Sequence, residues 1–141
     1  MRVTLDINFS KFHKKCEATI SKVARSTYAA TKEACEEIME ESLRQVPRDT
    51  GTLANSAFYN IQKAKDYGYE ATLGYGGSAV NPKTGVPVID YAVIVHEDLE
   101  AYHPIGKAKF LEDPIRDYAA EKFPRTVIKH VGPTLERENN E

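Results

Sequence analysis

Tryptophan is absent from this chain of 141 residues, and cysteine and methionine occur only twice each. Long apolar runs are also missing: none approaches the length needed to cross a bilayer, and the first residues lack the apolar core of a signal peptide. We therefore expect a soluble protein made in the cytosol, with no membrane partner. A formal net charge of -2 gives no electrostatic reason to expect non-specific binding to nucleic acid.

The composition, with 41% hydrophobic and 28% charged residues, is that of a single globular domain. We assign residues 1–135 to this domain. Residues 136–141 are polar with nothing to bury, and we assign them to a disordered tail. Cys16 and Cys35 fall on one predicted helix about 28 Å apart, which is too far for an intrachain disulfide. We expect both to be reduced packing residues.

The hydrophobic period changes near residue 10. Apolar and polar residues alternate over residues 3–9, which predicts a β-strand with one buried face. After Ser10, a residue type that caps helices, apolar residues recur three or four apart until Pro47. This spacing predicts one amphipathic helix over residues 11–45. Its length of about 50 Å exceeds the diameter of a small domain, so either its end frays or part of it packs on another subunit.

Charge is segregated along this predicted helix. The first half is basic and the second half acidic, an order that opposes the helix macrodipole and so does not serve helix stability. Three interpretations remain open: a solvated surface, head-to-tail pairing with a neighbouring subunit, or a basic end turned toward DNA. The residues concerned are Lys11, Lys14, Lys15, Lys22 and Arg25, and then Glu33, Glu36, Glu37, Glu40 and Glu41.

Residues 46–56, Val-Pro-Arg-Asp-Thr-Gly-Thr-Leu-Ala-Asn-Ser, have the chemistry of a rigid, hydrogen-bonded corner. Pro47 stops the helix, Gly51 allows a tight turn, Asp49 and Thr50 can cap neighbouring amides, and Leu53 pins the turn to the core.

Next, residues 59–61 and 69–75 are expected to form two strands joined by a tight turn. Residues 76–87 are rich in glycine, proline and polar residues and predict a protruding, mobile arm. For the apolar, β-branched run at residues 90–96 we favour a buried strand, with a short helix as the alternative. Helical spacing returns beyond residue 109, and Pro124 should end or kink that helix.

These elements together predict an α+β fold. It consists of an N-terminal strand, one long amphipathic helix, a small antiparallel sheet with a protruding loop, and a C-terminal helix.

Three sequence blocks resemble those of bacteriophage tail-completion proteins, which are also described as minor capsid or tail-component proteins. The first resembles the pattern Pro-x-Asp-Thr-Gly-x-Leu-x-x-Ser, the second Tyr-Ala-x-x-Val-x-Glu, and the third Lys-Phe-Leu-x-x-Pro. The chain departs from the family at Ala54 and Asn55, where a basic residue is frequent, and at residues 97–99, where Glu-Asp-Leu stands in place of a Glu-x-Gly. The matching residues are Pro47, Asp49, Thr50, Gly51, Leu53 and Ser56, then Tyr91, Ala92, Val95 and Glu97, then Lys109, Phe110, Leu111 and Pro114.

The resemblance implies a structural protein of the phage neck, acting in tail completion or head-tail joining. Minor capsid and tail-terminator roles in the same region are the alternatives. It implies no enzyme activity and no cofactor, and it places the protein in the virion after synthesis in the bacterial cytoplasm. The partners would be other neck and tail proteins and further copies in a homo-oligomeric ring, with DNA only as the content of the channel.

Two segments are candidates for partner binding. One end of the long helix, with Phe12, Cys16 and Ile20, would meet a neighbouring subunit. The arm, with Val80, Asn81 and Lys83, would become ordered when it docks on a tail or capsid protein.

Two other interpretations compete with the neck protein: a generic interaction module in the host cell and a small metal-dependent hydrolase. His96, Glu97 and His103, near Asp98 and Glu100, offer imidazole and carboxylate groups of the kind that bind zinc or manganese. The spacing argues against it, because a helical metalloprotease site has two histidines four residues apart. We favour a solvated acidic turn in which His96 is a hydrogen-bonded packing residue.

Overall fold

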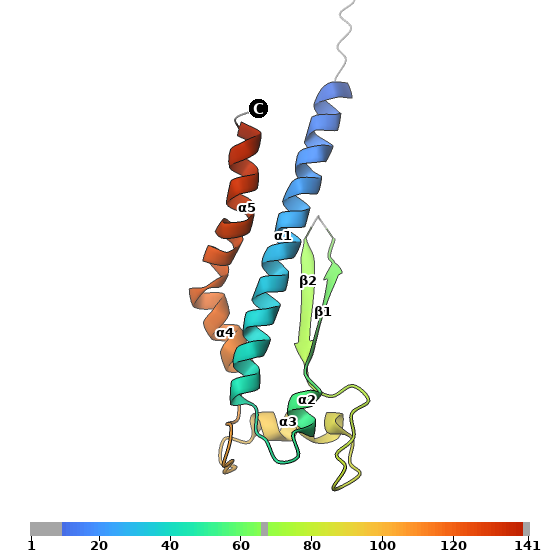
Figure 1. Ribbon diagram of the computed structural model, residues 1–141, viewed down its shortest axis with the longest axis vertical. Coiled ribbons are helices and arrows are strands. Elements are labelled where there is room, and N and C mark those ends of the chain that lie inside the picture. Colours follow the sequence, from blue (N-terminus) through green and yellow to red (C-terminus); the bar gives the residue numbers. More distant parts are fainter. Residues whose placement is uncertain (1–9, 66–67, 140–141) are drawn as a thin grey trace, which may run out of the picture.

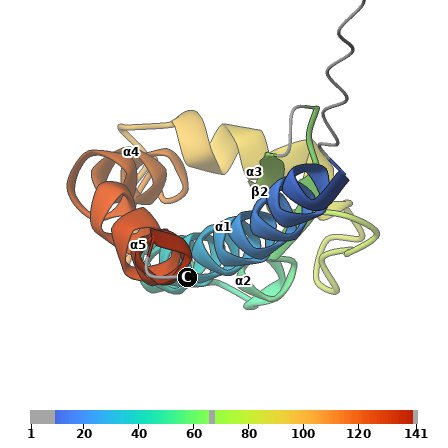
Figure 2. The ribbon, with the colours of Figure 1, turned by 90° about the horizontal axis from the view of Figure 1, so that it is seen from above.

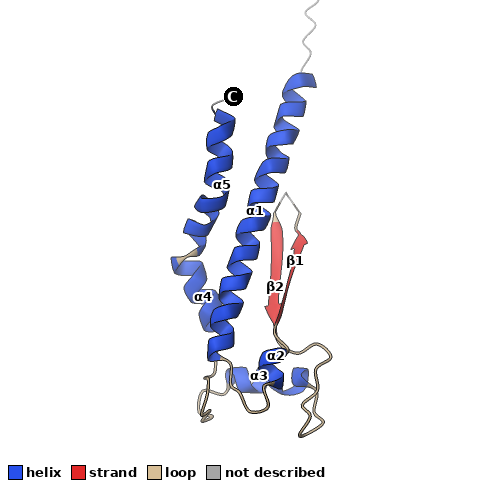
Figure 3. Ribbon diagram, in the orientation of Figure 1, coloured by secondary structure: helices blue, strands red, loops and turns tan. Residues whose placement is uncertain are grey.

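The computed structural model describes residues 10–65 and 68–139 of the chain. The strand predicted over residues 3–9 lies outside the described residues. The described part is an α+β structure with a two-stranded antiparallel sheet, as Figure 3 shows. None of its helices is long and apolar enough to span a bilayer.

The long helix α1 (Ser10–Gln45) is the spine of the molecule (Figure 1). Its prediction is confirmed within one residue at the start, and it ends two residues before Pro47. Threonines are tolerated inside it because Thr27 and Thr31 donate their hydroxyls to the carbonyl oxygens four residues earlier, both at 2.9 Å. Every buried residue of α1 lies at or after Ala30. The N-terminal half of the helix is therefore not part of the core.

The predicted hairpin is confirmed as β1 (Phe58–Lys63) and β2 (Tyr69–Gly74). The strands are antiparallel, with Phe58 opposite Gly74. An isolated two-stranded hairpin is only marginally stable in water, and this one is stabilised by packing against α1. The rings of Tyr28 and Tyr69 meet edge to face with centroids 5.2 Å apart, and Leu73 packs against Ala34, Ile38 and Tyr118.

The C-terminal segment forms two helices where one was expected, α4 (Glu112–Glu121) and α5 (Phe123–Asn139). The predicted break occurs just before Pro124, which lies in the first turn of α5, where its missing N–H is not needed. Lys122 separates the helices, and the Tyr118 hydroxyl hydrogen-bonds that of Thr126 across the break at 2.8 Å. In Figures 1 and 2, α1 runs between the hairpin and α5.

Helix α5 continues to Asn139, so residues 136–139, which we expected to be part of a disordered tail, are helical. The helix needs no burial there, because its hydrogen-bond ladder propagates from the turns that pack on α1. Glutamate and arginine, which dominate this last turn, are also good helix formers.

The strand favoured at residues 90–96 is wrong. These residues belong to helix α3 (Val88–Glu97), which was the alternative. The run is β-branched, but within the described residues it pairs with neither of the two strands of the sheet. Val88 and Ala92, four residues apart, are buried instead on one side of the helix. Asp90 in the first turn suits the positive end of the helix dipole.

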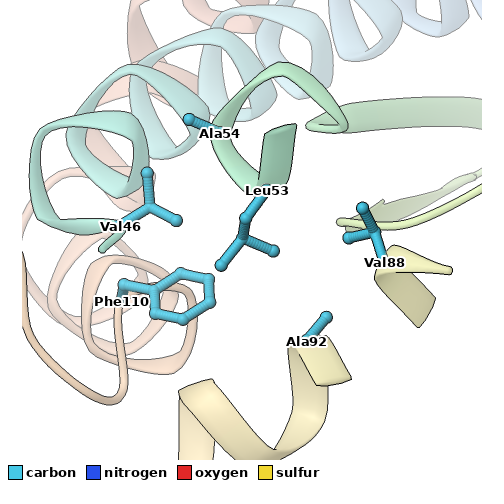
Figure 4. Packing of buried hydrophobic residues seen from close by; sticks show 6 residues of the cluster. All are labelled: Val46, Leu53, Ala54, Val88, Ala92 and Phe110. Carbon is cyan, nitrogen blue, oxygen red and sulfur yellow. The ribbon is translucent and has the colours of Figure 1, made fainter. Parts of the chain in front are cut away.

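Two buried clusters hold the chain together. The smaller consists of Ala34, Ile38 and Tyr118, under β2. The larger lies at the C-terminal end of α1, where the short helix α2 (Thr52–Asn55), α3 and the segment before α4 meet (Figure 4). Its members are Val46, Leu53, Ala54, Val88, Ala92 and Phe110.

Replacing Gly106 by alanine should destabilise the protein strongly. Gly106 has φ of 92°, and a Cβ there would lie 2.6 Å from the carbonyl oxygen of Gln45 and 2.6 Å from the nitrogen of Pro47. The loop would have to move away from the end of α1, and we expect a loss of roughly 2–4 kcal/mol in free energy of unfolding. Gly85→Ala is the matched control, since Gly85 has φ of 71° but an open Cβ position. It should cost about 1 kcal/mol. Equal losses in urea denaturation would contradict this account.

Candidate functional site

The three sequence blocks meet at one end of α1 (Figure 4). Leu53 and Ala54 come from the first block, Ala92 from the second and Phe110 from the third, and all four are buried in one cluster. Phe110, 1% exposed, also meets the ring of Tyr75 edge to face at 5.1 Å between centroids. Segments distant in sequence are thus held together by one hydrophobic cluster.

The first block is a hydrogen-bonded corner, as predicted. Gly51 has φ of 79° and precedes α2. The Thr50 hydroxyl lies 2.7 Å from that of Thr52 and accepts the Thr52 amide at 3.3 Å. Ser56 donates its hydroxyl to the Leu53 carbonyl at 2.6 Å and accepts the Gly76 amide at 3.0 Å. Ser56 therefore joins the corner to the start of the arm.

Asp49, which was expected to cap a backbone amide, pairs instead with the arm. Its carboxylate is 2.8 Å from the ammonium of Lys83, although both side chains are largely exposed. Within the arm, the Asn81 side chain accepts the Lys83 amide at 2.9 Å, and Val80 forms a bridge with Pro87. The arm therefore has hydrogen bonds of its own, and the Asp49–Lys83 ion pair holds it next to the first block.

His96 connects α3 to α4 (Glu112–Glu121). Its carbonyl accepts the Lys109 amide at 2.8 Å, and its Nε2 accepts the Glu112 amide at 3.3 Å. Nδ1 then carries the hydrogen and donates to Glu97 at 2.7 Å. The imidazole also packs edge to face on Phe110 at 5.0 Å. The prediction of a hydrogen-bonded packing histidine is confirmed.

Lys109 occupies the centre of this acidic group. Its ammonium lies 2.5 Å from Glu97 and 2.7 Å from Glu112, and its φ of 56° is the sole positive value among the described non-glycine residues. Hydrogen bonds to Glu112 and Glu97 raise the pKa of Lys109, while Lys109 and then His96 lower the pKa of Glu97. Because the folded pKa of Glu97 is lowered, its contribution to stability is present above its unfolded pKa and is lost as pH falls through the folded value.

The proposed histidine pair for a metal is not brought together. His96 and Glu97 have ligand atoms within 4.8 Å of one another and of Glu112, and His103 is not part of this group. The donor set does not fit a metal well, because the ammonium of Lys109 is already bound by both carboxylates and occupies the place between them. The arrangement is that of a structural ion-pair cluster.

His103 instead lines a separate cavity of about 190 Å³ against the first block. Tyr91 and Val95 of α3 form another wall, together with Pro104 and Ile105. The Nε2 atom of His103 is buried there without a hydrogen-bond partner in the described structure. The cavity is smaller than the roughly 300–1,000 Å³ typical of small-molecule sites. It has room for a side chain or for water.

The predicted partner-binding residues of α1 lie at the other end of the molecule. Phe12 and Ile20 are exposed and Cys16 is partly so. The structure therefore gathers Val80, Asn81 and Lys83 near the first block and leaves the α1 residues apart (Figure 1).

Sequence reasoning missed Ser42, which is fully buried and hydrogen-bonds the hydroxyl of Tyr75 at 2.7 Å. Burial is the main cause of the raised pKa of Tyr75. The available signal was the position of Ser42, four residues after Ile38 on the apolar stripe of the helix. The role of Glu112 beside His96 was also missed, and nothing local in the sequence indicates it.

Comparison of the chain with protein-family models, with curated proteins and with solved structures yields no match.

Zinc or manganese should leave the melting temperature of the unaltered protein unchanged, because the Lys109 ammonium holds the place between the carboxylates. Lys109→Met removes this cation, so His96, Glu97 and Glu112 become available as ligands, and metal should then raise Tm by a few degrees, about 2–5 °C. Lys107→Met is the matched control and should not respond. Stoichiometric metal binding by the unaltered protein would contradict this prediction and support the hydrolase interpretation.

Proposed function

We propose that the chain is a structural subunit of the neck of a long-tailed bacteriophage and that it acts in tail completion or head-tail joining. The observation that carries the proposal is the order and spacing of the three blocks, which resemble those of tail-completion proteins. Minor capsid and tail-terminator roles belong to the same region of the particle and remain as alternatives. In this role the chain assembles through protein contacts in a ring, within the virion, with DNA only as the content of the channel.

The positions of the three blocks in the fold support a structural role. Their apolar residues lie in the buried cluster at the end of α1. Their polar residues form the hydrogen bonds of the corner and the ion pairs of Lys109. The result is a rigid end that holds α3 and the arm, while half of the long helix contributes nothing to the core. A subunit that works by contact with neighbours needs such uncovered surface.

The chemistry of the described residues gives less support to a hydrolase. The cavity beside the first block is small, and both carboxylates of the acidic cluster are bound to the ammonium of Lys109. Cys35 is buried, and burial raises the pKa of its thiol, which keeps it protonated and weakly nucleophilic. No group of these residues provides an activated nucleophile beside a base.

Disruption of the gene in the phage or prophage that encodes it should yield filled heads and separate tails, visible by electron microscopy. Purified protein added to such a lysate should restore joined, infectious particles, whereas bovine serum albumin at the same concentration should not. Normal numbers of tailed, infectious particles from the disrupted gene would contradict the proposal.

A further inference from the structure

The outer face of α3 is apolar and acidic. Asp90, Val93, Ile94 and Glu97 follow the spacing i, i+3, i+4 and i+7, which places them on one side of the helix. Ile89, Val93 and Ile94 are 59%, 66% and 65% exposed. In a soluble protein, three neighbouring aliphatic side chains exposed on one short helix mark a contact surface.

Negative charge extends beyond this helix. Asp98 and Glu100 follow its end and flank Leu99, which is also exposed. No lysine or arginine occurs from residue 88 to residue 105. Of the cations from other parts of the chain, Lys109 reaches Glu97, and no described ion pair neutralises Asp90 or Glu100. We call residues 88–100 the acidic face.

The N-terminal part of α1 has the opposite character. Phe12, 66% exposed, begins an apolar stripe that continues through Cys16 and Ile20. Lys15, three residues after Phe12, lies next to the start of this stripe, whereas Lys14 lies on the opposite side of the helix. Neither lysine takes part in an ion pair among the described residues. Residues 10–25 contain five basic residues and a single acidic one. We call residues 10–25 the basic end.

The acidic half of α1 is not available to balance the positive charge of the basic end, because its glutamates already form ion pairs with other residues of the chain. Glu33 binds Lys129 at 2.8 Å and His130 at 2.7 Å, and Glu37 binds Lys122 at 3.1 Å. These contacts hold α4 and α5 against α1. Docking of α4 and α5 within the same chain, which was not among the three interpretations of the segregated charge, therefore accounts for part of the acidic half. Lys14 and Lys15 of the basic half are not used in this docking.

We propose that the basic end of one copy docks on the acidic face of a second copy. The inference rests on the proposed function, which calls for self-assembly. The two surfaces lie at opposite ends of α1 (Figure 1), so each copy offers one and receives the other. Such a contact is heterologous and builds a ring or a chain of copies. Each surface combines exposed apolar side chains with charge of one sign, and the opposite charges fix the orientation.

Charge reversal tests the contact. Lys14→Glu/Lys15→Glu and, separately, Asp90→Lys/Glu100→Lys should each raise the concentration needed for assembly by about tenfold or more. Light scattering measures the mass, and circular dichroism verifies the fold. Lys63→Glu/Lys65→Glu reverses the same charge on the hairpin and should assemble like the unaltered protein. High salt should weaken assembly of the unaltered protein.

Restoration is the decisive result. An equimolar mixture of the two reversed variants should assemble, and so should the chain that carries all four substitutions, because opposite charges again face each other. A monomeric unaltered protein at all concentrations, or variants whose assembly is unaffected or not restored, would overturn the contact.

The two proposals fail separately. An unaltered protein that stays monomeric and still joins heads to tails overturns this contact and leaves the neck role standing. The opposite outcome is also possible to distinguish. If charge reversal abolishes assembly and the complementary reversal restores it, but the protein does not restore head-tail joining, the contact is supported and the neck role is overturned.

Discussion

The packing of Phe110 beneath the end of α1 is the contact on which the rest of this structure depends. Its ring is nearly inaccessible to solvent and touches Tyr75 and His96 on two sides. Through these neighbours it joins β2, α3 and α4 to the last turn of the long helix. The core is small, so a single aromatic side chain of this kind accounts for a large share of the stabilisation. Without it, α3 would lose the one aromatic member of the buried cluster in which Val88 and Ala92 lie.

The cluster around Phe110 gives the molecule two different ends. We call the end that contains this cluster the fixed end, and the N-terminal half of α1 the free end. At the fixed end, Leu53 and Phe110 belong to one buried cluster, and Lys109 binds the two carboxylates beside His96. Toward the free end, α1 extends beyond its buried residues, with Phe12 exposed. A contact protein gains from this arrangement, because a rigid end can present α3 and the arm in fixed positions while the free end reaches another molecule.

Sequence reasoning succeeded where the determinant is local. Proline at position 47 stops a helix, and the alternating residues on either side of a turn sequence indicate a hairpin. It failed for α3, since a β-branched run becomes a strand only if a neighbouring strand is available. The pairs Glu33–Lys129 and His96–Glu112 join residues far apart in sequence, and no local pattern reveals them. The three blocks were recognised as a set, but their convergence on Phe110 required the folded structure.

Hydrogen exchange in the variant Phe110→Leu tests this account most directly. Leucine keeps the site apolar but loses both ring contacts, and we expect about 1–2 kcal/mol of destabilisation. The amides of α3 and of the last turn of α1 should then exchange about tenfold faster or more, while those around Ala34 and Thr126 change little. Unchanged exchange in α3, or an equal increase along the whole chain, would contradict the central place given to Phe110.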